Sequence, residues 1–390
     1  MLKTGNWAGA RKALCVVLAT LAWLALMDVT LGWVLRPGWP WSVKVQSLAR
    51  YFDYGRSVEG KLQQSLGADG RGTDMVAQAG WLDPSQWHNE PCAVAAADCR
   101  LVAVYGQSFA LRAARALEQL DPQVQLRLVA GPAAPLAHSY AAYRADVAGS
   151  PARVVVIGVL ASSLVRSSQL SMTAGTFEHP APYTYPRFTL DGQTLHEQTP
   201  LIQTYPQFVQ AWVERGAQWH DFRDQLMAYS PGLDPFAWNG GWSDASVLVR
   251  LVRRAWVTSH DSTDAALRNV QGLSPAFAAE LPVAQRLLVQ AQQLAQQRHQ
   301  QLIVLLLNDR GYARWLDIGL RSALQSQGLT VLSSSDYFSS LNMNNFELDG
   351  HFIPTADQRI ARALHQSIAP TLGLGALSPP APSYTARSHK

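Results

Sequence analysis

A serine stands where a short apolar run gives way to a helical pattern. The segment YGQSF covers residues 105–109, and the apolar run 101–105 leads into it. A strand-to-helix turn of this kind exposes a side chain above the carboxyl edge of a sheet and sets backbone N–H groups beside it. Ser108 is therefore a candidate nucleophile next to a candidate anion-stabilising site. The alternative is a structural helix cap, since serine is a common N-cap residue.

An aspartate and a histidine precede the last helical pattern of the chain. Asp349 and His351 lie two positions apart in LDGHFIP, residues 348–354. Side chains at i and i+2 of an extended segment project to the same side, so Asp349 can accept from one imidazole nitrogen while the other faces Ser108. Such a pair supplies an oriented general base to a serine. The alternative is a surface turn, because Asp-Gly is a frequent turn dipeptide.

These residues together resemble the SGNH (GDSL-type) hydrolase family, whose nucleophile follows the first strand and whose Asp-x-x-His or Asp-x-His motif precedes the last helix. GQSF at 106–109 and DGHFIPTADQRIARAL at 349–364 are similar to these two motifs, and the second is the more specific. The resemblance covers about 101–372 discontinuously. It implies acyl transfer through a serine ester, with the serine as nucleophile, the histidine as general base and the aspartate holding the imidazole.

The resemblance also implies an oxyanion hole made of the Ser108 amide, a glycine amide after the second strand and an asparagine side chain after the third. Gly131 is similar in position to that glycine. The third element departs from the family, because VIGVLASS at 156–163 contains no asparagine, and Ser162 or Ser163 is the candidate substitute. Loss of one such donor costs about 100- to 1000-fold in rate. A slow or non-hydrolytic site is therefore an alternative.

No metal or cofactor is expected for this chemistry. The histidines lack the helical two-histidine spacing of zinc enzymes. His138 and His179 are candidates to line the cleft, although polar roles at a helix start and in a loop are the favoured alternative. Gln107 replaces the aspartate of the family motif, at a position that performs no proton transfer.

Short apolar runs alternate with helical patterns over most of the chain, which predicts an α/β fold with a mainly parallel sheet covered on both faces. The expected strands are 101–105, 124–130, 153–160, 302–307 and 330–333, and the expected helices follow Ser108 or cover 282–299 and 354–368. Thr355 and Gln358 have capping-box spacing at the start of the last helix. These elements predict a three-layer α/β/α, SGNH-like domain at about 96–372.

One long interval, at about 165–280, interrupts this alternation. It is rich in aromatic residues, proline and glycine, and long insertions in α/β enzymes emerge at the strand ends that carry the site. We therefore expect a lid or a partner-binding subdomain. Its tryptophans are candidates for stacking on sugars, with core packing as the alternative. They are Trp212, Trp219, Trp238, Trp242 and Trp256. Arg250, Arg253 and Arg254 are candidates to meet acidic sugars or lipid head groups, with a solvated helix face as the favoured alternative.

The segment 13–35 contains one charge and is long enough to cross a hydrocarbon core of about 30 Å. Basic residues before it favour a cytoplasmic tail at 1–12 and a body outside the cytoplasm, while basic residues after it argue against this orientation. The alternative is a cleaved signal peptide, whose apolar core is usually shorter. Asp28 lies late in the span and is a candidate contact for a membrane partner, with hydration near the interface as the favoured alternative.

The composition excludes two classes of protein. Charged residues make up 15% of the chain, which is too few for a mostly disordered protein. The formal charge is +4, from 32 Lys and Arg against 28 Asp and Glu, and without Lys3, Arg11 and Lys12 the balance is 29 to 28. Nothing therefore supports nucleic-acid binding.

Three further features carry weaker patterns. Residues 36–95 are expected to form a stem and connector, with a stem helix from 43 to about 66. Residues 373–390 are expected to be a disordered tail. Cys92 and Cys99 are candidates for a disulfide in an oxidising compartment, with two free thiols as the alternative.

We expect from these observations a single-pass protein of the bacterial inner membrane with its catalytic domain in the periplasm. It would act on acyl esters of cell-envelope or exported polysaccharide, as an esterase or an O-acyltransferase. A membrane-embedded acyltransferase or a glycan-export protein is the candidate partner. The alternative is a catalytically degenerate scaffold that binds glycan or a membrane partner; the missing asparagine supports this alternative, and the intact serine, aspartate and histidine oppose it.

Overall fold

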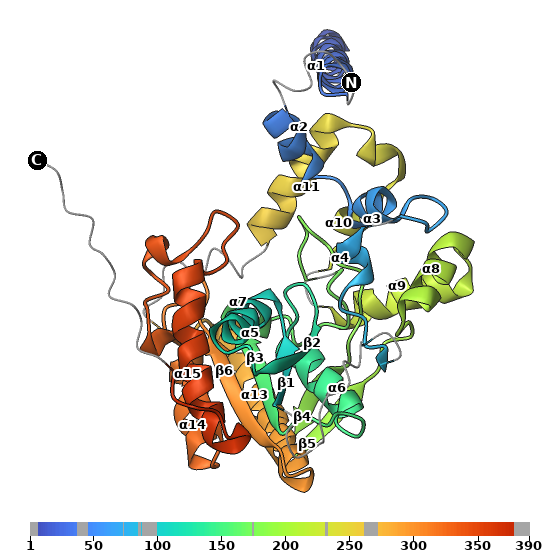
Figure 1. Cartoon of the computed structure of the whole chain (residues 1–390). Helices are drawn as coiled ribbons and strands as arrows, with labels where there is room; N and C mark the ends of the chain where they lie inside the picture. The colour runs from blue at the N-terminus through green and yellow to red at the C-terminus, as the bar shows by residue number, and fades with distance from the viewer. Residues whose placement is uncertain are drawn as a thin grey trace, which may run out of the picture.

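A computed structural model describes residues 7–36, 46–72, 74–84, 87, 100–173, 175–230, 233–260 and 272–377 of the chain (Figure 1). Its central feature is a five-stranded parallel sheet in the order β2-β1-β3-β6-β7. The strands are β1 (Leu101–Gly106), β2 (Gln125–Ala130), β3 (Val154–Leu160), β6 (Gln301–Leu307) and β7 (Thr330–Ser333). The α/β class and the parallel sheet predicted from the apolar runs are confirmed.

The inner strands are buried on both faces. Every residue of β1 and β3 is buried, and so is every residue of β6 after the first. A strand covered on both faces needs apolar side chains at successive positions rather than at alternate ones. This explains why LVAVYG in β1 and VVVIGVL in β3 are apolar throughout.

Helices cover both faces of the sheet (Figure 1). One pair is α5 (Ser108–Leu120) with α15 (Pro354–Leu372), and the other is α6 (Leu136–Asp146) with α13 (Pro275–Gln297). Successive side chains of a strand point to opposite faces. Val104 therefore packs with the first pair, and its neighbour Tyr105 packs with the second.

One predicted helix cap is wrong. Thr355 and Gln358 have the spacing of a capping box, but α15 begins at Pro354, and Ile353 before it makes no side-chain cap. Proline suits the first helical position because its missing N–H has no acceptor there. Thr355 therefore lies inside the first turn, where it cannot act as the N-cap. α13 also starts earlier than expected, at Pro275.

The segment between β3 and α13 adds no strand to the central sheet within the described residues. It comprises α7 (Ala161–Leu164), the hairpin β4 (Arg187–Asp191) and β5 (Thr194–Gln198), and then α8 (Tyr205–Glu214), α9 (Ala217–Tyr229), α10 (Pro235–Trp238), η2 (Gly241–Asp244) and α11 (Val247–His260). Trp212, Trp219 and Trp238 are buried, with their rings in contact. These three tryptophans pack a core, whereas Trp242 and Trp256 are exposed.

The expected stem helix is instead two helices that pack on the rest of the chain. α2 (Gln46–Asp53) and α3 (Val58–Leu66) are separated by a turn at Gly55. A Cβ at Gly55 would lie 2.0 Å from the Arg250 carbonyl oxygen, so only glycine permits this approach. Leu62 of α3 is buried in the core shared with α6 and α13. This segment is therefore part of the folded body.

Short helices and a C-terminal extension complete the described chain. The helices are α4 (Met75–Gln78), η3 (Asp317–Arg321), α14 (Ser322–Ser326), η4 (Ser334–Asp336) and η5 (Met343–Asn345). After α15, Leu374 donates its N–H to the Ala369 carbonyl oxygen at 3.0 Å. The first residues of the expected disordered tail are thus held against α15, and residues 378–390 lie outside the described chain.

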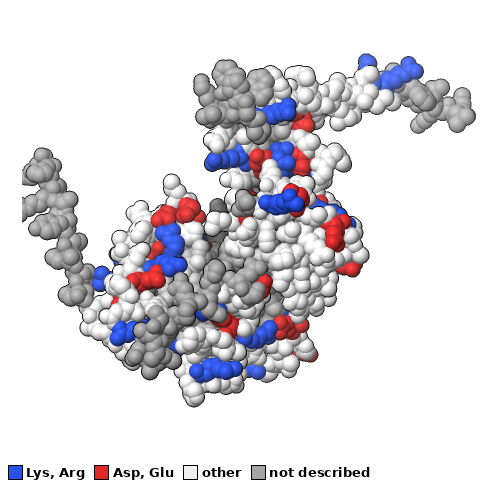
Figure 2. Space-filling model, turned by 45° about the vertical axis from the view of Figure 1, so that its right-hand side comes forward, with Lys and Arg blue, Asp and Glu red and all other residues white. Residues whose placement is uncertain are grey.

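α1 (Trp7–Val34) is the one described helix that is long and apolar enough to cross a membrane. Its span Gly9–Val34 has a mean hydropathy of 2.2, and no part of its most apolar stretch is buried. Such a helix near an N-terminus is a membrane anchor or a signal sequence. In Figure 2 it extends from the body as a mostly uncharged rod. Asp28 of α1 accepts from Ser246 Oγ at 3.0 Å and from the Leu248 N–H at 2.8 Å, a contact within the chain that the sequence did not predict.

Candidate active site

Ser108 and His351 meet beyond the carboxyl end of β1. Ser108 is the first residue of α5, and His351 lies in the loop before α15. The distance between His351 Nε2 and Ser108 Oγ is 2.7 Å, although 243 positions separate the residues in sequence. This distance suits a hydrogen bond and proton transfer between the hydroxyl and the imidazole. The structure thus brings together the two residues that the sequence analysis paired.

Aromatic side chains fix the imidazole against α5. The rings of Phe109 and His351 are 4.8 Å apart, with 31° between their planes. Phe352 meets Phe109 edge-on, also at 4.8 Å, and is fully buried. A backbone bridge joins Phe352 to Phe346 across the loop. His351 therefore precedes a residue that is anchored in the core, which keeps the histidine beside the serine.

Asp349 lies beside the other imidazole nitrogen. Its Oδ2 is 3.0 Å from His351 Nδ1, but these two atoms are not aligned for a hydrogen bond. Its Oδ1 accepts from the His351 backbone N–H at 3.1 Å, which lowers the pKa of the Asp349 carboxyl. The Asp349 side chain is 62% exposed. The carboxylate is close enough to orient the ring, and water weakens its attraction for a charged imidazole.

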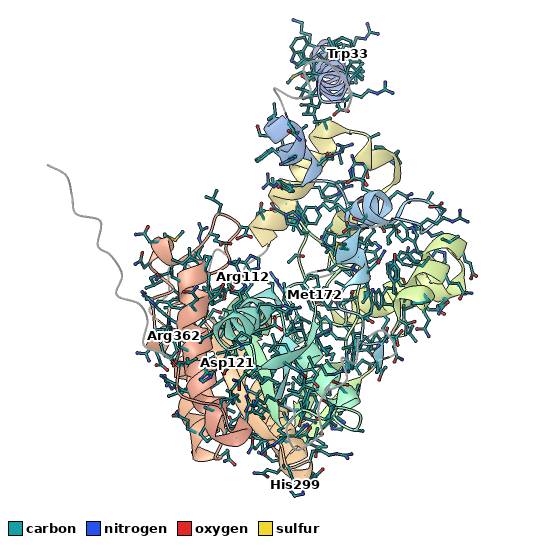
Figure 3. All side chains as sticks on the ribbon, viewed as in Figure 1. Trp33, Arg112, Asp121, Met172, His299 and Arg362 are labelled. Carbon is teal, nitrogen blue, oxygen red and sulfur yellow. The ribbon has the colours of Figure 1, made fainter. Side chains whose placement is uncertain are left out.

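Arg112 ties the His351 loop to α5, where Figure 3 labels it. Its guanidinium donates to the two carboxylate oxygens of Glu347 at 2.7 and 3.0 Å and to Asp357 at 3.1 Å. Glu347 in turn donates its backbone N–H to the His351 carbonyl oxygen at 2.8 Å. Arg112 was not predicted from the sequence. The signal was its place one helical turn after Ser108, which puts both side chains on one side of α5.

The Gly131 amide is already engaged in this structure. It donates to the Gly106 carbonyl oxygen at 3.2 Å. A Cβ at Gly131 would lie 3.0 Å from the Tyr183 ring and 3.1 Å from Gly80 Cα, so the glycine permits close packing. The Ser108 amide belongs to the first turn of α5, where N–H groups have no acceptor within the helix. Of the two amides that the family resemblance implies, the Ser108 amide has the better position to donate to an oxyanion.

Asp309, a buried acid just after β6, contacts Ser162 just after the neighbouring strand β3. The Ser162 N–H donates to Asp309 Oδ1 at 3.0 Å, between the ends of the paired strands β3 and β6. Burial raises the pKa of the Asp309 carboxyl to about 6. The Ser163 hydroxyl is buried without a hydrogen-bond partner among the described residues. Asp309 was not predicted, although it follows the apolar run 302–307 almost directly.

Gln107 is buried beside the candidate nucleophile. Its side chain is fully buried, and within the described chain neither atom of its carboxamide has a hydrogen-bond partner. A Cβ at Gly158 would lie 3.4 Å from Gln107 Oε1, which puts the carboxamide against β3. A buried polar group without a partner costs about 1–3 kcal/mol. Gln107 lies behind Ser108, between α5 and β3.

The other predicted site residues make contacts elsewhere or lie outside the described chain. His138 is buried with Nε2 2.7 Å from a backbone carbonyl oxygen, and burial lowers its pKa to about 4. The imidazole of His179 meets the Tyr54 ring edge-on at 5.4 Å. Cys92 and Cys99, the candidate disulfide, fall in a stretch that the structure does not describe.

The expected solvated face of arginines in the insertion is wrong. Arg253 is fully buried, and Arg250 and Arg254 are mostly buried. The ion pairs join Arg250 to Asp53 at 3.0 Å, Arg253 to Asp244 at 2.5 Å and Arg254 to Glu178 at 2.7 Å. Acidic partners from other elements compensate these charges, and this is why the arginines turn inward.

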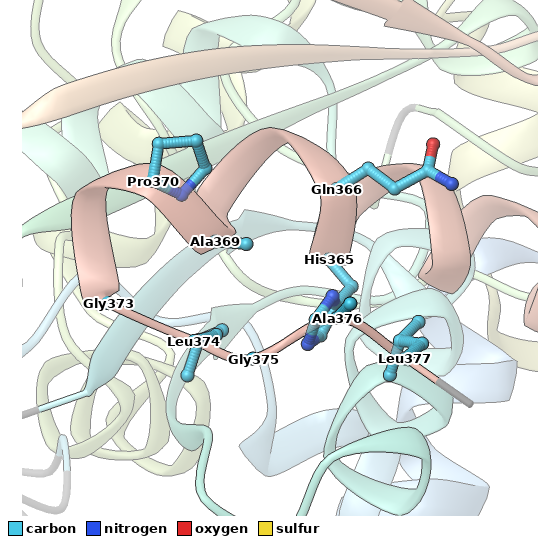
Figure 4. Close-up of a pocket in the computed structure, with 9 residues that line it drawn as sticks. All are labelled: His365, Gln366, Ala369, Pro370, Gly373, Leu374, Gly375, Ala376 and Leu377. Carbon is cyan, nitrogen blue, oxygen red and sulfur yellow. The ribbon is translucent and has the colours of Figure 1, made fainter.

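A pocket of about 620 Å³ lies at the end of α15, away from Ser108. Its lining comes from the last turns of α15 and the residues that follow, among them His365, Pro370 and Leu374 (Figure 4). His365 Nε2 is 2.9 Å from Asp121 Oδ2, so this histidine already has a partner. None of the lining residues belongs to the site at Ser108.

Comparison of the chain with protein-family models, with curated proteins and with solved structures found no match. The resemblance to the SGNH hydrolases therefore depends on the site residues themselves. The fold and the site together define an α/β protein with a serine and a histidine in contact at the carboxyl edge of a parallel sheet.

Proposed function

We propose that this protein is a membrane-anchored serine acyl esterase or O-acyltransferase of the SGNH type. The observation that carries the proposal is the 2.7 Å distance between Ser108 Oγ and His351 Nε2 beyond β1. A serine that only capped α5 would need no imidazole at its hydroxyl. Arg112 supports the proposal because it holds the histidine loop, and Asp349 supports it because its carboxylate lies 3.0 Å from His351 Nδ1. The catalytic unit is an SGNH-like, three-layer domain at about 96–372 with an insertion at about 165–280.

The proposed reaction consists of two acyl transfers. His351 Nε2 takes the hydroxyl proton as Ser108 Oγ attacks the carbonyl carbon of an ester. The bond to the leaving alcohol then breaks, and the alcohol leaves with the proton from His351. Water or a sugar hydroxyl, deprotonated by the same histidine, then attacks the serine ester. The bond between Ser108 Oγ and the acyl carbon breaks, and His351 returns the proton to Ser108 Oγ as the acid or the new ester leaves. The Ser108 amide at the start of α5 stabilises the oxyanion in both steps.

We propose α1 as a lasting membrane anchor. The contacts of Asp28 with Ser246 and Leu248 support this, because cleavage after the apolar segment would remove a carboxylate that accepts from the first turn of α11. Basic residues in the short N-terminal segment favour an N-terminus in the cytoplasm and a body in the bacterial periplasm. A signal sequence would be released from the folded protein.

Acyl esters of cell-envelope or exported polysaccharide are the proposed substrates. An anchored periplasmic body stays at the membrane surface, where such glycans emerge and where a membrane-embedded acyltransferase or a glycan-export protein would be its partner. The insertion at about 165–280 is the proposed lid or partner-binding subdomain. This assignment extends the acyl chemistry and depends on it.

Covalent labelling of Ser108 tests the enzyme directly. The full-length chain in detergent is treated with a fluorophosphonate, and the modified peptide is identified by mass spectrometry alongside release of acetate from an acetylated polysaccharide. We expect an adduct on Ser108 that is lost in Ser108→Ala and in His351→Ala. Ser326→Ala, at an exposed serine of α14, is the matched control and should label like the wild type. Wild-type protein that neither labels nor releases acetate would refute the proposal.

A glycan-binding scaffold without turnover is the second candidate. The engagement of the Gly131 amide with Gly106 and the lack of an asparagine after β3 favour it, because both reduce oxyanion stabilisation. The same protein preparations distinguish the two. A scaffold binds acetylated polysaccharide equally well in wild-type and Ser108→Ala protein and releases no acetate from it.

A further inference from the structure

α11 carries an exposed apolar face on the side opposite its arginines. Leu251, Val252 and Trp256 are 36%, 59% and 44% exposed. At 100° per residue, Leu251 and Val252 lie about 100–160° around the helix from Arg250 and Arg253. Trp256 lies about 60° from Arg253, at the border of the face, and donates its ring N–H to Asp234 at 3.1 Å. A helix on a water-soluble body normally turns its apolar face inward and its charged face outward. α11 has apolar side chains outward and arginines inward, which is the reverse of a helix whose outer side meets water.

The position of α11 relative to α1 explains this arrangement. Asp28 accepts from the Leu248 N–H and from Ser246 Oγ, and so a residue of α1 caps the start of α11. A Cβ at Gly32 of α1 would lie 3.7 Å from the Val247 side chain, so the two helices are in contact. Asp28 lies about 9 Å along the helix axis from the end of α1, at 1.5 Å per residue. Asp28 also lies 19 residues after Gly9, where the apolar span begins, or about 29 Å along the axis. If the hydrocarbon core of about 30 Å begins near Gly9, the first turn of α11 therefore lies at its opposite edge, next to the lipid head groups.

Other exposed rings and apolar side chains lie next to this face. Trp242 of η2, just before α11, is 86% exposed. Leu48 and Tyr51 of α2 are each 46% exposed, and the Tyr51 ring lies 4.2 Å from the Arg254 guanidinium carbon of α11. Figure 1 shows α2 and α11 directly beneath α1. Tryptophan and tyrosine concentrate where lipid head groups meet acyl chains.

We propose that α11, with Trp242 and the exposed side of α2, lies in the membrane interface beside α1. This inference rests on the membrane anchoring proposed for α1. Lipid fits the surface better than a protein partner because the face is continuous with the span itself and carries interfacial rings. The arginines of α11 are paired within the chain, so attachment comes from apolar contact and depends little on anionic lipid.

Fluorescence quenching by lipids tests this placement in the full-length chain. A genetically encoded, environment-sensitive fluorescent amino acid replaces Val252, Trp242, Val17 or Gln325, one at a time, in nanodiscs of zwitterionic phosphatidylcholine with and without spin-labelled lipid. Val17 lies in α1 and reports the anchor, and Gln325 in α14 is the exposed control. We expect strong quenching at 17, 242 and 252 and none at 325. Replacing half of the lipid with phosphatidylglycerol should leave the pattern unchanged.

The outcomes separate the two proposals. Quenching at 17 with positions 242 and 252 as unquenched as 325 would overturn the interfacial placement, leave the anchor standing and free this face for a protein partner. No quenching at 17 would overturn the anchor and the inference together. The labelling of Ser108 is measured separately, so neither quenching result bears on the proposed acyl chemistry.

Discussion

The central sheet buries apolar side chains and exposes charged ones, whereas α11 buries charged side chains and exposes apolar ones. In the sheet, the residues of β1 and β3 are buried and apolar, and the candidate catalytic residues Asp349 and His351 are partly exposed at its edge. In α11, Arg253 is fully buried and Val252 faces outward. A buried charge needs partners that replace its hydration, whereas an exposed group that loses its partner is hydrated by water.

This difference predicts that substitutions in the two regions act on different observables. Loss of a partly exposed group at the sheet edge should change the rate and leave the free energy of unfolding nearly unchanged. Loss of a partner beneath α11 should lower the free energy of unfolding with no direct effect on the chemistry. The five predictions below test or refine this division.

His351→Ala should have the largest effect on rate. Removal of the general base should lower ester hydrolysis by about 1000-fold or more. The midpoint of thermal unfolding should stay close to that of the wild type, because His351 is partly exposed and water can hydrate the Ser108 hydroxyl that loses its partner. Hydrolysis of an acetyl ester and thermal unfolding in detergent measure the two quantities. An unchanged rate would contradict the assigned role.

Asp244→Ala should have the largest effect on stability. Asp244 accepts from Arg253 at 2.5 Å and from the Ser57 N–H at 2.9 Å, and its loss leaves a buried guanidinium without its counter-charge. We expect a loss of about 3–5 kcal/mol in the free energy of unfolding. Asp224→Ala, which breaks the exposed pair with Arg223, is the matched control and should cost about 0–1 kcal/mol. Equal losses in denaturant titrations would contradict the contrast.

Arg112→Ala tests a residue that positions the His351 loop without touching substrate. A misplaced histidine should lower kcat by up to about 100-fold and leave KM nearly unchanged. Arg112→Lys should restore the rate only in part, because lysine cannot bind Glu347 with two parallel hydrogen bonds. The control is Arg115→Ala on the same helix, whose partner Glu118 is exposed. Equal rates for the Arg112 and Arg115 variants would exclude a positioning role.

Asp309 is the buried acid of the sheet edge and should make stability depend on pH. Burial raises its pKa from 3.8 to about 6, so between these values the folded protein holds a proton that the unfolded chain releases. Protonated Asp309 therefore stabilises the folded state, and this stabilisation should be lost as pH rises from about 4 to 6. Asp309→Asn removes that contribution, so the stability of the variant relative to wild type should rise over this window.

The pH dependence of His138 has the opposite sign. Burial lowers its pKa to about 4, so its contribution to stability grows as pH rises from 4 to 6.5. Because His138 is present in both the wild type and Asp309→Asn, its effect cancels when the free energy of unfolding of one is subtracted from that of the other. A difference that stays constant from pH 4 to pH 6 would show that Asp309 ionises alike in the folded and unfolded chains.

Asp28→Ala should have the smallest effect. Loss of a side-chain acceptor at a helix N-terminus costs about 0.5–2 kcal/mol. Asp28 of α1 is such an acceptor, because it binds the Leu248 N–H in the first turn of α11. Asp28→Asn keeps an acceptor oxygen and is the matched control, with stability close to wild type. Thermal unfolding in nanodiscs gives both values. Equal losses in the two variants would show that the charge of Asp28, rather than its capping, stabilises the contact.

The sheet and the serine–histidine contact were predictable because they follow from local patterns. Strands buried on both faces are continuous apolar runs, and β1 and β6 differ from the predicted ranges by one residue at one end. The carboxyl ends of parallel strands share one edge of the sheet, so Ser108 after β1 had a defined place. The Asp349–His351 motif supplied the second half of the contact.

The buried charges were not predictable, because their partners are distant in sequence. Arg253 resembles a solvated residue until Asp244 and Ser57 are brought beneath it, and Ser57 lies 187 positions from Asp244. Asp309 likewise meets Ser162 across 147 positions. Composition and periodicity describe the element that carries a residue, whereas burial of a charge depends on what the rest of the chain places around it.

The separation of 218 residues between Asp28 and Ser246 bears on biogenesis. The ribosome completes α1 long before it makes α11, so with the proposed anchor the Asp28 carboxylate would already lie at the bilayer when the later helix emerges. The two ends of this contact can join only after the residues between them have been synthesised. A version that begins after residue 35 would keep Ser246 as the N-cap of α11 but would lack the carboxylate that accepts from the Leu248 N–H. Experiments that use such a version would report on a protein with an altered surface beside the insertion.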